Sequence, residues 1–246
     1  MQLSKRLEAV AGMVTPGNRV ADIGCDHAYV SIYLLNKGIA PSVVAMDVNE
    51  GPLVRARENI KKYGFGDRID TRKSNGLEKL NAGEADTVLI AGMGGALMVD
   101  IILEHKEVVS SLKELILQPQ SEIFKVRQML CDIGFFITHE NMVKEDGKYY
   151  VMMKAEESVL FEDKYKLAGE EHFHFGRLLL EQRHPILLEF FNKERLMNQN
   201  IYQSLLAEPT ENSILRQAEI KDKLELIDKG LSYFQKKGDV EYENEY

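Results

Sequence analysis

Short apolar segments alternate with longer amphipathic ones between residues 19 and 156, and this alternation limits the possible folds more than any other feature of the chain. The apolar segments have the length of strands, and the others have the length and period of helices. Such an alternation predicts a doubly wound α/β sheet with right-handed crossovers. The predicted strands are 19–23, 43–47, 68–73, 87–91, 114–117, 135–143 and 148–154, and the predicted helices here are 28–36, 52–63, 96–104 and 122–133.

The last two predicted strands have no helix between them. The tripeptide Glu145-Asp146-Gly147 separates them and is typical of a hairpin turn. We therefore expect five parallel strands followed by a hairpin, so that the sheet contains an antiparallel closing strand.

The pattern changes after about residue 158, and no further strand is predicted. Helices are expected at 170–183, 186–206 and 213–237, with breaks at Pro185 and in the turn 207–212. Apolar side chains recur at helical spacing in the last two, which predicts an antiparallel, coiled-coil-like helical hairpin. We expect two domains, 1–158 and 159–246. The predicted apolar stripes are Leu187, Phe190, Met197, Ile201 and Leu205, and Ile220, Leu224, Ile227, Leu231 and Phe234.

The composition excludes several classes of protein. No stretch approaches the ~20 apolar residues of a membrane span, and the two cysteines, Cys25 and Cys131, form no CxxC motif. Two cysteines without such a motif predict a cytoplasmic protein with reduced thiols and without a structural metal. The net charge of −8 argues against a uniformly basic nucleic-acid-binding face. Half of the excess negative charge lies in the last eight residues. Contacts with nucleic-acid phosphates would come from basic side chains, and the candidates are Lys5, Arg6, Arg55, Arg57, Lys61 and Lys62.

The segment that joins the first strand to the next helix carries the clearest chemical signal. Gly24 allows a close backbone approach to a ligand, as the glycines of dinucleotide sites do. However, Asp26 and Tyr29 stand where a dinucleotide site needs its later glycines, and Asp26 would repel a pyrophosphate. A ligand that carries a sulfonium and an ammonium would instead be attracted by Asp22 and Asp26. The sequence therefore favours S-adenosylmethionine over NAD, although these acids could also simply cap the turn and helix.

Two further strand ends are expected to hold the same cofactor. Asp47 follows Gly24 by 23 residues, a spacing at which a carboxylate binds ribose hydroxyls. Asn75 could pair with the adenine amino group, or the Asn75-Gly76 pair could form only a turn. We expect their neighbours Cys25 and Val48 to line the cofactor site as well.

The ends of the fourth and fifth predicted strands face the same crevice and are candidates for substrate binding. The loop from Gly92 to Gly95 leaves backbone groups exposed where a target base could stack or form hydrogen bonds, but it could also be only a flexible loop. Gln118 and Gln120 flank Pro119, and their amides could read the edge of a base or merely close a turn. We expect Gly92 and Met93 to contact cofactor, and Gly94, Gly95, Gln118, Pro119 and Gln120 to contact substrate.

Five motifs together resemble those of the bacterial tRNA (adenine-22-N1)-methyltransferase family. They are DIGCDHAYV, AMDVN, the Asn-Gly turn, IAGMGG and LQPQ, and by motif the resemblance covers residues 1 to about 160. The resemblance implies a class I, Rossmann-like S-adenosylmethionine-binding domain, a C-terminal helical hairpin and a tRNA substrate. It also implies a cofactor crevice formed by Asp22, Gly24, Asp26, His27, Asp47, Asn75, Gly92 and Met93.

The expected reaction needs no general base, because N1 of adenine carries a lone pair at neutral pH. We expect Asp26 or His27 to shape the electrostatics around the cationic product. Since N1 lies on the Watson–Crick edge, the target base must be unpaired or flipped out. Two alternatives remain: a small-molecule N-methyltransferase, which the net charge favours, and a non-catalytic cofactor-binding scaffold. The scaffold has no need for Asp22, Asp26 and Asp47 together.

Overall fold

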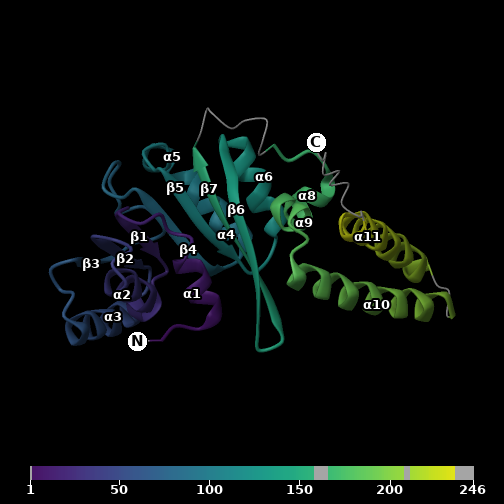
Figure 1. The fold of residues 1–246 in the computed structure, drawn as a ribbon, viewed down its shortest axis with the longest axis horizontal. Coiled ribbons are helices and arrows are strands. Elements are labelled where there is room, and N and C mark those ends of the chain that lie inside the picture. Colours follow the sequence, from purple (N-terminus) through teal and green to yellow (C-terminus); the bar gives the residue numbers. More distant parts are fainter. Residues whose placement is uncertain (1, 158–165, 208–210, 236–246) are drawn as a thin grey trace, which may run out of the picture. The chain divides into compact units, whose positions relative to one another are not determined.

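The computed structural model describes residues 2–157, 166–207 and 211–235 and divides the chain into two compact units. The first unit spans Met1–Ala168 and the second Gly169–Tyr246 (Figure 1). The domain boundary expected between residues 158 and 159 lies outside the described residues.

The first unit is built on a seven-stranded sheet in the order β3-β2-β1-β4-β5-β7-β6. Neighbouring strands from β3 to β5 are parallel, whereas β7 pairs antiparallel with both β5 and β6. The predicted α/β class and its antiparallel closing strand are thus confirmed. The strands are β1 (Val20–Ile23), β2 (Val43–Asp47), β3 (Ile69–Lys73), β4 (Thr87–Met93), β5 (Glu114–Pro119), β6 (Phe135–Glu145) and β7 (Lys148–Glu157).

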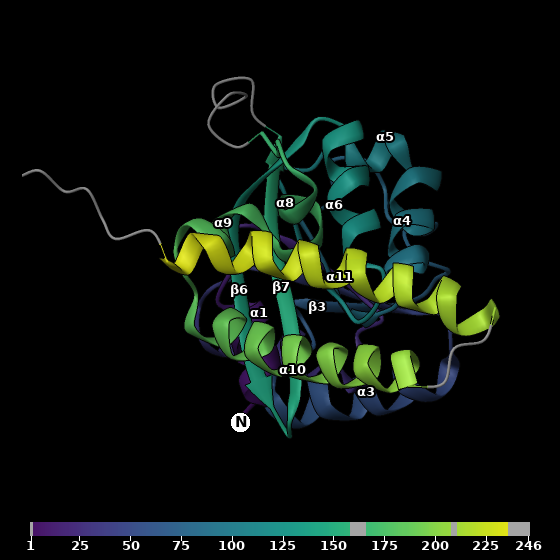
Figure 2. The ribbon, with the colours of Figure 1, turned by 90° about the vertical axis from the view of Figure 1, so that its right-hand side faces the viewer.

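Helices cover both faces of this sheet. In one layer α2 contacts both α1 and α3, and in the other α4 contacts both α5 and α6. Figure 2 shows α1 and α3 apart from the group of α4, α5 and α6. The central strands β1 and β5 are buried along their whole length because both of their faces are covered. The helices are α1 (Lys5–Ala11), α2 (Tyr29–Asn36), α3 (Glu50–Tyr63), α4 (Gly95–Glu104), α5 (Lys106–Val109) and α6 (Ile123–Asp132), and a 3₁₀ turn, η1, spans Asp26–Ala28.

The β6–β7 hairpin turns at Asp146 and Gly147. Their φ angles are 48° and 74°, which suits a tight two-residue turn between antiparallel strands. The register pairs Glu145 with Lys148, so the predicted turn is present at the predicted residues. The long hairpin returns β7 to the sheet beside β5.

A buried polar cluster joins the strands at the end of the sheet where the parallel strands begin. Glu114 at the start of β5 accepts hydrogen bonds of 2.6 Å from the hydroxyls of Thr15 and Thr87, and Lys154 of β7 lies 2.9 Å away. Burial raises the pKa of Glu114, but the bonds from these three side chains outweigh that effect and lower it. The cluster joins the end of the α1 segment to β4, β5 and β7.

The second unit contains α8 (Glu170–Phe175), α9 (Arg177–Glu181), α10 (Pro185–Ala207) and α11 (Glu211–Gln235). The prediction of one helix over 170–183 is wrong, because Gly176 has φ 91° and ψ 120°, outside the helical region. In the predicted turn 207–212, residues 208–210 lie outside the described residues, and α11 already begins at Glu211.

Helices α10 and α11 pack side by side as the expected hairpin (Figure 1). Phe191 is fully buried and meets Phe234 edge-on at 6.0 Å between ring centres. A Cβ on Gly230 would lie 2.4 Å from the Phe191 ring, so only glycine admits this ring.

Leu187 is buried as predicted, but further along α10 the buried residues are Phe191 and Asn198, whereas Met197 and Ile201 of the predicted stripe are exposed. In α11, Ile220, Ile227 and Leu231 of the predicted stripe are buried.

Candidate active site

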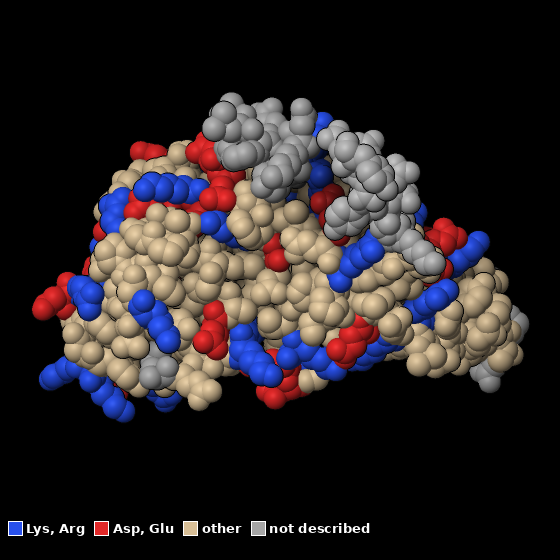
Figure 3. All heavy atoms as spheres, in the orientation of Figure 1, with Lys and Arg blue, Asp and Glu red and all other residues tan. Residues whose placement is uncertain are grey.

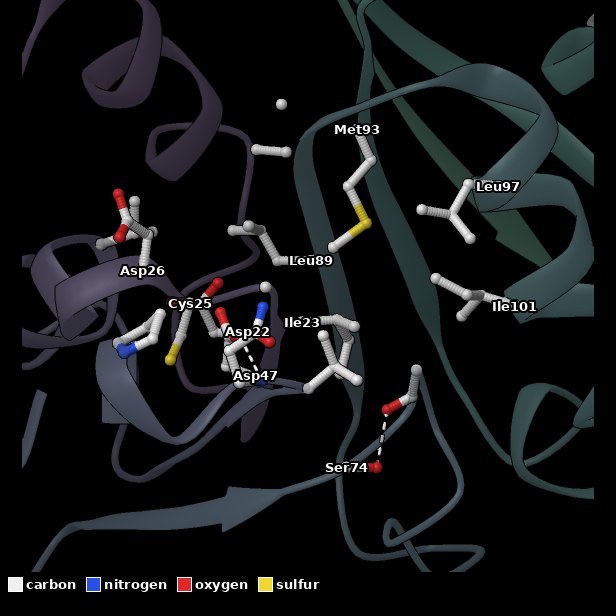
Figure 4. A pocket seen from close by; sticks show the side chains of 18 of the residues that line it. Asp22, Ile23, Cys25, Asp26, Asp47, Ser74, Leu89, Met93, Leu97 and Ile101 are labelled. Carbon is white, nitrogen blue, oxygen red and sulfur yellow. Dashed lines mark hydrogen bonds between the residues drawn. The ribbon is translucent and has the colours of Figure 1, made fainter. Parts of the chain in front are cut away.

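A cavity of about 470 Å³ lies at the carboxyl ends of β1, β2 and β4. This volume is typical of small-molecule sites, and the position is the one at which open α/β sheets bind ligands. Figure 4 shows Asp22, Cys25 and Asp47 on one side of the pocket and Met93, Leu97 and Ile101 on the other. Residues from α1, α2, α3 and α4 and from the loops that follow β1, β2, β3 and β5 therefore converge with these strand ends on one site.

All nine of the residues predicted to bind cofactor line this pocket. They are Asp22, Gly24, Cys25, Asp47, Val48, Asn75, Gly76, Gly92 and Met93, and Asp26 and Gln120 line it as well. His27, Gly94, Gly95, Gln118 and Pro119 do not line it. The structure thus gathers the predicted cofactor residues but leaves most of the predicted substrate residues outside the pocket wall.

The turn after β1 is shaped by Gly24 and held to β2. The Gly24 N–H donates to the Met46 carbonyl at 2.8 Å, and φ of Gly24 is 71°. A Cβ at this position would lie 2.3 Å from the Met93 methyl group. Glycine is therefore favoured here by its backbone conformation, and its lack of a side chain also lets the Met93 methyl group lie against the turn.

Asp22 is the buried carboxylate of the pocket. Its side chain accepts a 2.6 Å hydrogen bond from the Ser31 hydroxyl in α2. Burial raises the pKa of Asp22 to about 6; the hydrogen bonds from Ser31 oppose this rise, and the charge of Asp47 adds to it. A cationic ligand would relieve this cost by pairing with the carboxylate.

Cys25 is buried beside the same carboxylates and has no nucleophilic role. Burial raises the pKa of its thiol far above the ordinary value, and the charges of Asp22 and Asp47 raise it further. The side chain therefore stays a neutral thiol and forms part of the pocket wall.

Asp47 stands at the end of β2, and its position follows from the strand register. Asp22 pairs with Ala45 and Ile23 with Met46, so Asp47 projects just beyond the end of β1. Its Oδ1 accepts the Asn49 N–H at 2.8 Å, which fixes the loop that leads into α3. The half-buried carboxylate keeps acceptor capacity for hydroxyl groups of a ligand.

Asp26 and His27 lie at the outer edge of the site. The Asp26 side chain is 76% exposed, and its Oδ1 lies 3.2 Å from Nε2 of His27. Asp26, His27 and Ala28 all have positive φ, a conformation that non-glycine residues rarely adopt. The Asn59 amide in α3 donates to the His27 carbonyl at 3.0 Å and supports this turn.

Apart from Gln120, the predicted substrate residues around β4 and β5 have structural contacts instead of lining the cavity. The N–H of Gly95 donates to the Ser121 carbonyl at 3.0 Å, and a Cβ on Gly95 would lie 2.4 Å from that oxygen. Gln118 is fully buried, and its amide accepts from Arg6 at 2.6 Å and donates to the Pro119 carbonyl at 3.1 Å. Gly94 packs near the Ser121 hydroxyl.

Several pocket residues were not predicted as cofactor-binding residues. Arg6 comes from the first helix, whose place in the fold depends on tertiary packing that the sequence does not reveal. Ser74 could have been inferred from the Ser-Asn-Gly turn, where its hydroxyl donates to the Gly76 carbonyl at 2.9 Å. The other unpredicted lining residues are Leu7, Ile23, Tyr29, Val30, Asn49, Pro52, Leu89, Ala91, Leu97 and Ile101.

Within the described residues, no group of three or more His, Cys, Asp or Glu side chains is placed to hold a metal ion. The described helices also include none that is both long and apolar enough to cross a bilayer.

Comparison with known proteins places the chain in a family. The model of the methyltransferase domain family matches residues 3–153. The chain is 32% identical over 228 residues to the tRNA (adenine(22)-N(1))-methyltransferase of Bacillus subtilis, covering 92% of this chain and 96% of the relative.

Solved structures agree with this match. The B. subtilis m1A22 tRNA methyltransferase TrmK superposes with a TM-score of 0.83 at 31% identity, over 94% of this chain and 99% of that chain. A Streptococcus pneumoniae relative in complex with S-adenosyl-L-methionine gives a TM-score of 0.82 at 29% identity, over 94% and 100%. The protein therefore belongs to the tRNA (adenine-22-N1)-methyltransferase family.

Proposed function

We propose that this protein transfers the methyl group of S-adenosylmethionine to N1 of adenine 22 in tRNA. The observation that carries the proposal is the convergence of Asp22, Gly24 and Asp47 on one cavity in a chain of this family. S-adenosylmethionine supplies an electrophilic methyl group on a cationic sulfur.

The residues present fit this cofactor. Ribose hydroxyls suit the acceptor oxygens of Asp47, and the positive charges of the ligand suit the buried Asp22. Gly24 leaves a cradle where a Cβ would collide with Met93, so backbone and ligand can approach closely. Asn75 and Gly76 line the pocket beside the β2 end, where we place the adenine of the cofactor.

The residues of the chain contribute orientation and electrostatics to the reaction. The N1 lone pair of adenine attacks without prior loss of a proton, so the site must align the base and exclude water. Methylation makes the base cationic, and we assign Asp26, with His27 at 3.2 Å, to stabilise the charge that develops. The exposed Gln120 and the half-buried Gly92 line the side of the pocket on which we place the target base.

Contacts with tRNA phosphates are assigned to the exposed basic side chains of α3, namely Arg55, Lys61 and Lys62. Arg57 is less available, because it forms an ion pair with Glu50 and a hydrogen bond with Thr71. On the face of the protein in Figure 3, basic and acidic side chains are interspersed. We therefore expect binding to a local basic strip, and an affinity that falls steeply with salt. A tRNA substrate and two free cysteines fit a cytoplasmic location.

The direct test is to incubate the protein with methyl-labelled S-adenosylmethionine and an unmodified tRNA transcript, and then to map the labelled nucleoside. We expect 1-methyladenosine at position 22, and no label in a transcript with guanine at that position. Label at another position would reject the assigned target. Absence of label from total tRNA would instead favour the small-molecule N-methyltransferase.

A further inference from the structure

The turn that follows β1 has two halves that are supported by different elements. Its first half is attached to β2, because the N–H groups of Gly24 and Cys25 both donate to the Met46 carbonyl, at 2.8 Å and 3.0 Å. Its second half is η1, which carries Asp26 and His27. The first half therefore shapes the wall of the cofactor pocket, whereas the second half carries the two side chains assigned to the cationic product.

The second half is held in a conformation that its residues rarely adopt. The φ angles of Asp26, His27 and Ala28 are 33°, 43° and 57°, and none of the three residues is glycine. Non-glycine residues enter this left-handed region only at a cost in free energy, so three in succession persist only where the surroundings hold them. Ala28 is fully buried and its N–H donates to the Cys25 carbonyl at 3.0 Å, which holds one end of the turn. The middle of the turn needs a further support.

The side chain of Asn59 in α3 supplies this support. Its Nδ2 donates a 3.0 Å hydrogen bond to the His27 carbonyl, across 32 residues of sequence. That carbonyl belongs to the planar peptide that joins His27 to Ala28, so the bond fixes the orientation of both residues. Asparagine is a poor helix former, because its amide competes for nearby backbone groups. Its place inside α3 is therefore explained by a side-chain contact outside the helix.

The orientation of the turn decides where its two polar side chains lie. Asp26 lines the pocket, and its Oδ1 lies 3.2 Å from Nε2 of His27. The centre of the His27 ring lies 5.8 Å from that of Tyr29, which lines the pocket from the start of α2. Asn59 is half-buried and does not itself line the pocket. It therefore affects the site through the turn that it holds.

We propose that Asn59 is a positioning residue for methyl transfer, which holds the turn in the conformation that directs Asp26 and His27 to the target base. This inference rests on the proposed function and on the assignment of Asp26 to the cationic product. It divides the turn by task, because the bonds to Met46 serve the cofactor and the bond from Asn59 serves the reaction. Mutation can separate the two tasks, since the supports come from β2 and from α3.

The test measures cofactor affinity and turnover separately for variants of Asn59 in the full chain. We expect Asn59→Ala to lower kcat for a tRNA transcript by about 3- to 10-fold, the factor that one hydrogen bond between protein groups contributes. Asn59→Asp keeps the shape but replaces the amide donor by a carboxylate that repels the His27 carbonyl, so its loss should be at least as large. The calorimetric affinity for S-adenosylmethionine should change by less than about twofold in both variants, because the bond supports the reaction and not cofactor binding.

A double-mutant cycle shows whether Asn59 acts through the turn. In a chain that already carries Asp26→Asn and His27→Ala, the turn has lost the side chains that it positions. Asn59→Asp should then lower the single-turnover rate by less than about twofold further, since the effects of coupled residues are not additive. Asn59→Gln, which keeps the amide on a longer side chain, should recover part of the rate that is lost in Asn59→Ala.

Gln128→Ala is the matched control. Gln128 is also a helical residue whose amide donates a hydrogen bond, from Nε2 to Oδ1 of Asp132 at 2.8 Å, but it belongs to α6 and does not line the pocket. Its replacement should leave kcat and the cofactor affinity unchanged. Melting temperatures show whether each variant is folded, and Asn59→Asp, which leaves no cavity, decides the question if Asn59→Ala is unstable.

Three results would overturn the inference. Equal losses of cofactor affinity and turnover would make the Asn59 bond part of the general support of the pocket. An unchanged kcat in folded variants would show that the turn holds its conformation without Asn59. Full additivity with the Asp26 and His27 substitutions would place the action of Asn59 elsewhere. Failure of the wild-type chain to methylate any tRNA is a separate outcome, and it would reject the proposed function itself.

Discussion

The Ser31 hydroxyl donates a 2.6 Å hydrogen bond to the carboxylate of Asp22, and the pair is buried between β1 and α2. The hydrogen bonds from Ser31 do not offset the cost of burying the charge, so the pKa of Asp22 is raised to about 6. Without ligand, the contribution of Asp22 to stability is complete below its unfolded pKa of about 3.8. It is lost as the pH rises through 6, because the unfolded chain then releases this proton more readily.

The affinity for S-adenosylmethionine should therefore depend on pH in the opposite direction to the stability of the free protein. A cationic ligand favours the ionised carboxylate, and at pH 5 only about one Asp22 in ten is ionised. We expect roughly tenfold weaker binding at pH 5 than at pH 7.5, measured by calorimetry. Asp22→Asn should bind weakly and show little pH dependence over this range; an unaltered pH profile in this variant would contradict the role of Asp22.

Asp47→Ala should weaken the affinity for S-adenosylmethionine by about 10- to 100-fold, through loss of the charged acceptor for the ribose hydroxyls. Asp70→Ala is a suitable control, because that carboxylate pairs with Arg72 on β3 and does not line the pocket. Calorimetry gives the affinity, and thermal melting shows whether the loop held by the Asp47–Asn49 bond has loosened. Unchanged affinity would remove Asp47 from the ribose site.

Asp26→Asn should lower turnover more than it lowers the melting temperature. The side chain is 76% exposed and therefore contributes little to the core, whereas it lines the pocket and is assigned to stabilise the cationic product. Single-turnover kinetics with tRNA would separate methyl transfer from binding. If the ligand-free variant loses its melting transition, Asp26 is instead needed to hold the turn of positive φ angles.

Gly95→Ala tests whether that glycine contacts substrate or packs the loop. The added methyl group would lie 2.4 Å from the Ser121 carbonyl and 2.8 Å from the Glu122 carbonyl. We expect a loss of about 1–3 kcal/mol of stability from overpacking, measured by urea denaturation. Wild-type stability combined with a raised KM for tRNA would restore the substrate role.

Truncation after Ala168 should leave the affinity for S-adenosylmethionine intact, because every residue that lines the pocket lies between Arg6 and Gln120. We expect the affinity for tRNA to fall, as measured by filter binding. Circular dichroism checks that the shortened chain is folded. Retained tRNA affinity would show that the α10–α11 hairpin serves another purpose.

The sequence predicted most of the sheet because its signals are local. Each predicted strand lies within one of the observed ones or overruns it by one residue, and the Asp146-Gly147 turn fixes the hairpin. The break at Gly176 was missed because a glycine within a helical pattern does not reveal its φ angle. Leu187 of α10 was predicted correctly, but Phe191 was missed because it fits against Gly230, a contact between helices that periodicity does not encode.

The residues of the site also divide into those that local sequence signals reveal and those whose position depends on tertiary packing. Asp22, Gly24 and Asp47 could be predicted because strand ends and their spacing place them at one edge of the sheet. Arg6 could not be assigned to the pocket, since its position depends on how α1 packs and on Gln118, more than a hundred residues further along the chain. The roles of Asp26, His27, Gly94 and Gln120 stay predictions.

Arg6 lines the pocket, and its guanidinium lies 5.3 Å from the ring centre of Tyr150, which has a consequence for synthesis of the protein. The strands that carry Asp22 and Asp47 leave the ribosome early, but the ring beside Arg6 belongs to β7, the last strand of the sheet. A nascent chain that ends before residue 148 has the motif residues of the pocket without this support. We therefore expect tight cofactor binding to begin only when β7 has been translated. Binding of the cofactor would then indicate that the last strand has joined the sheet.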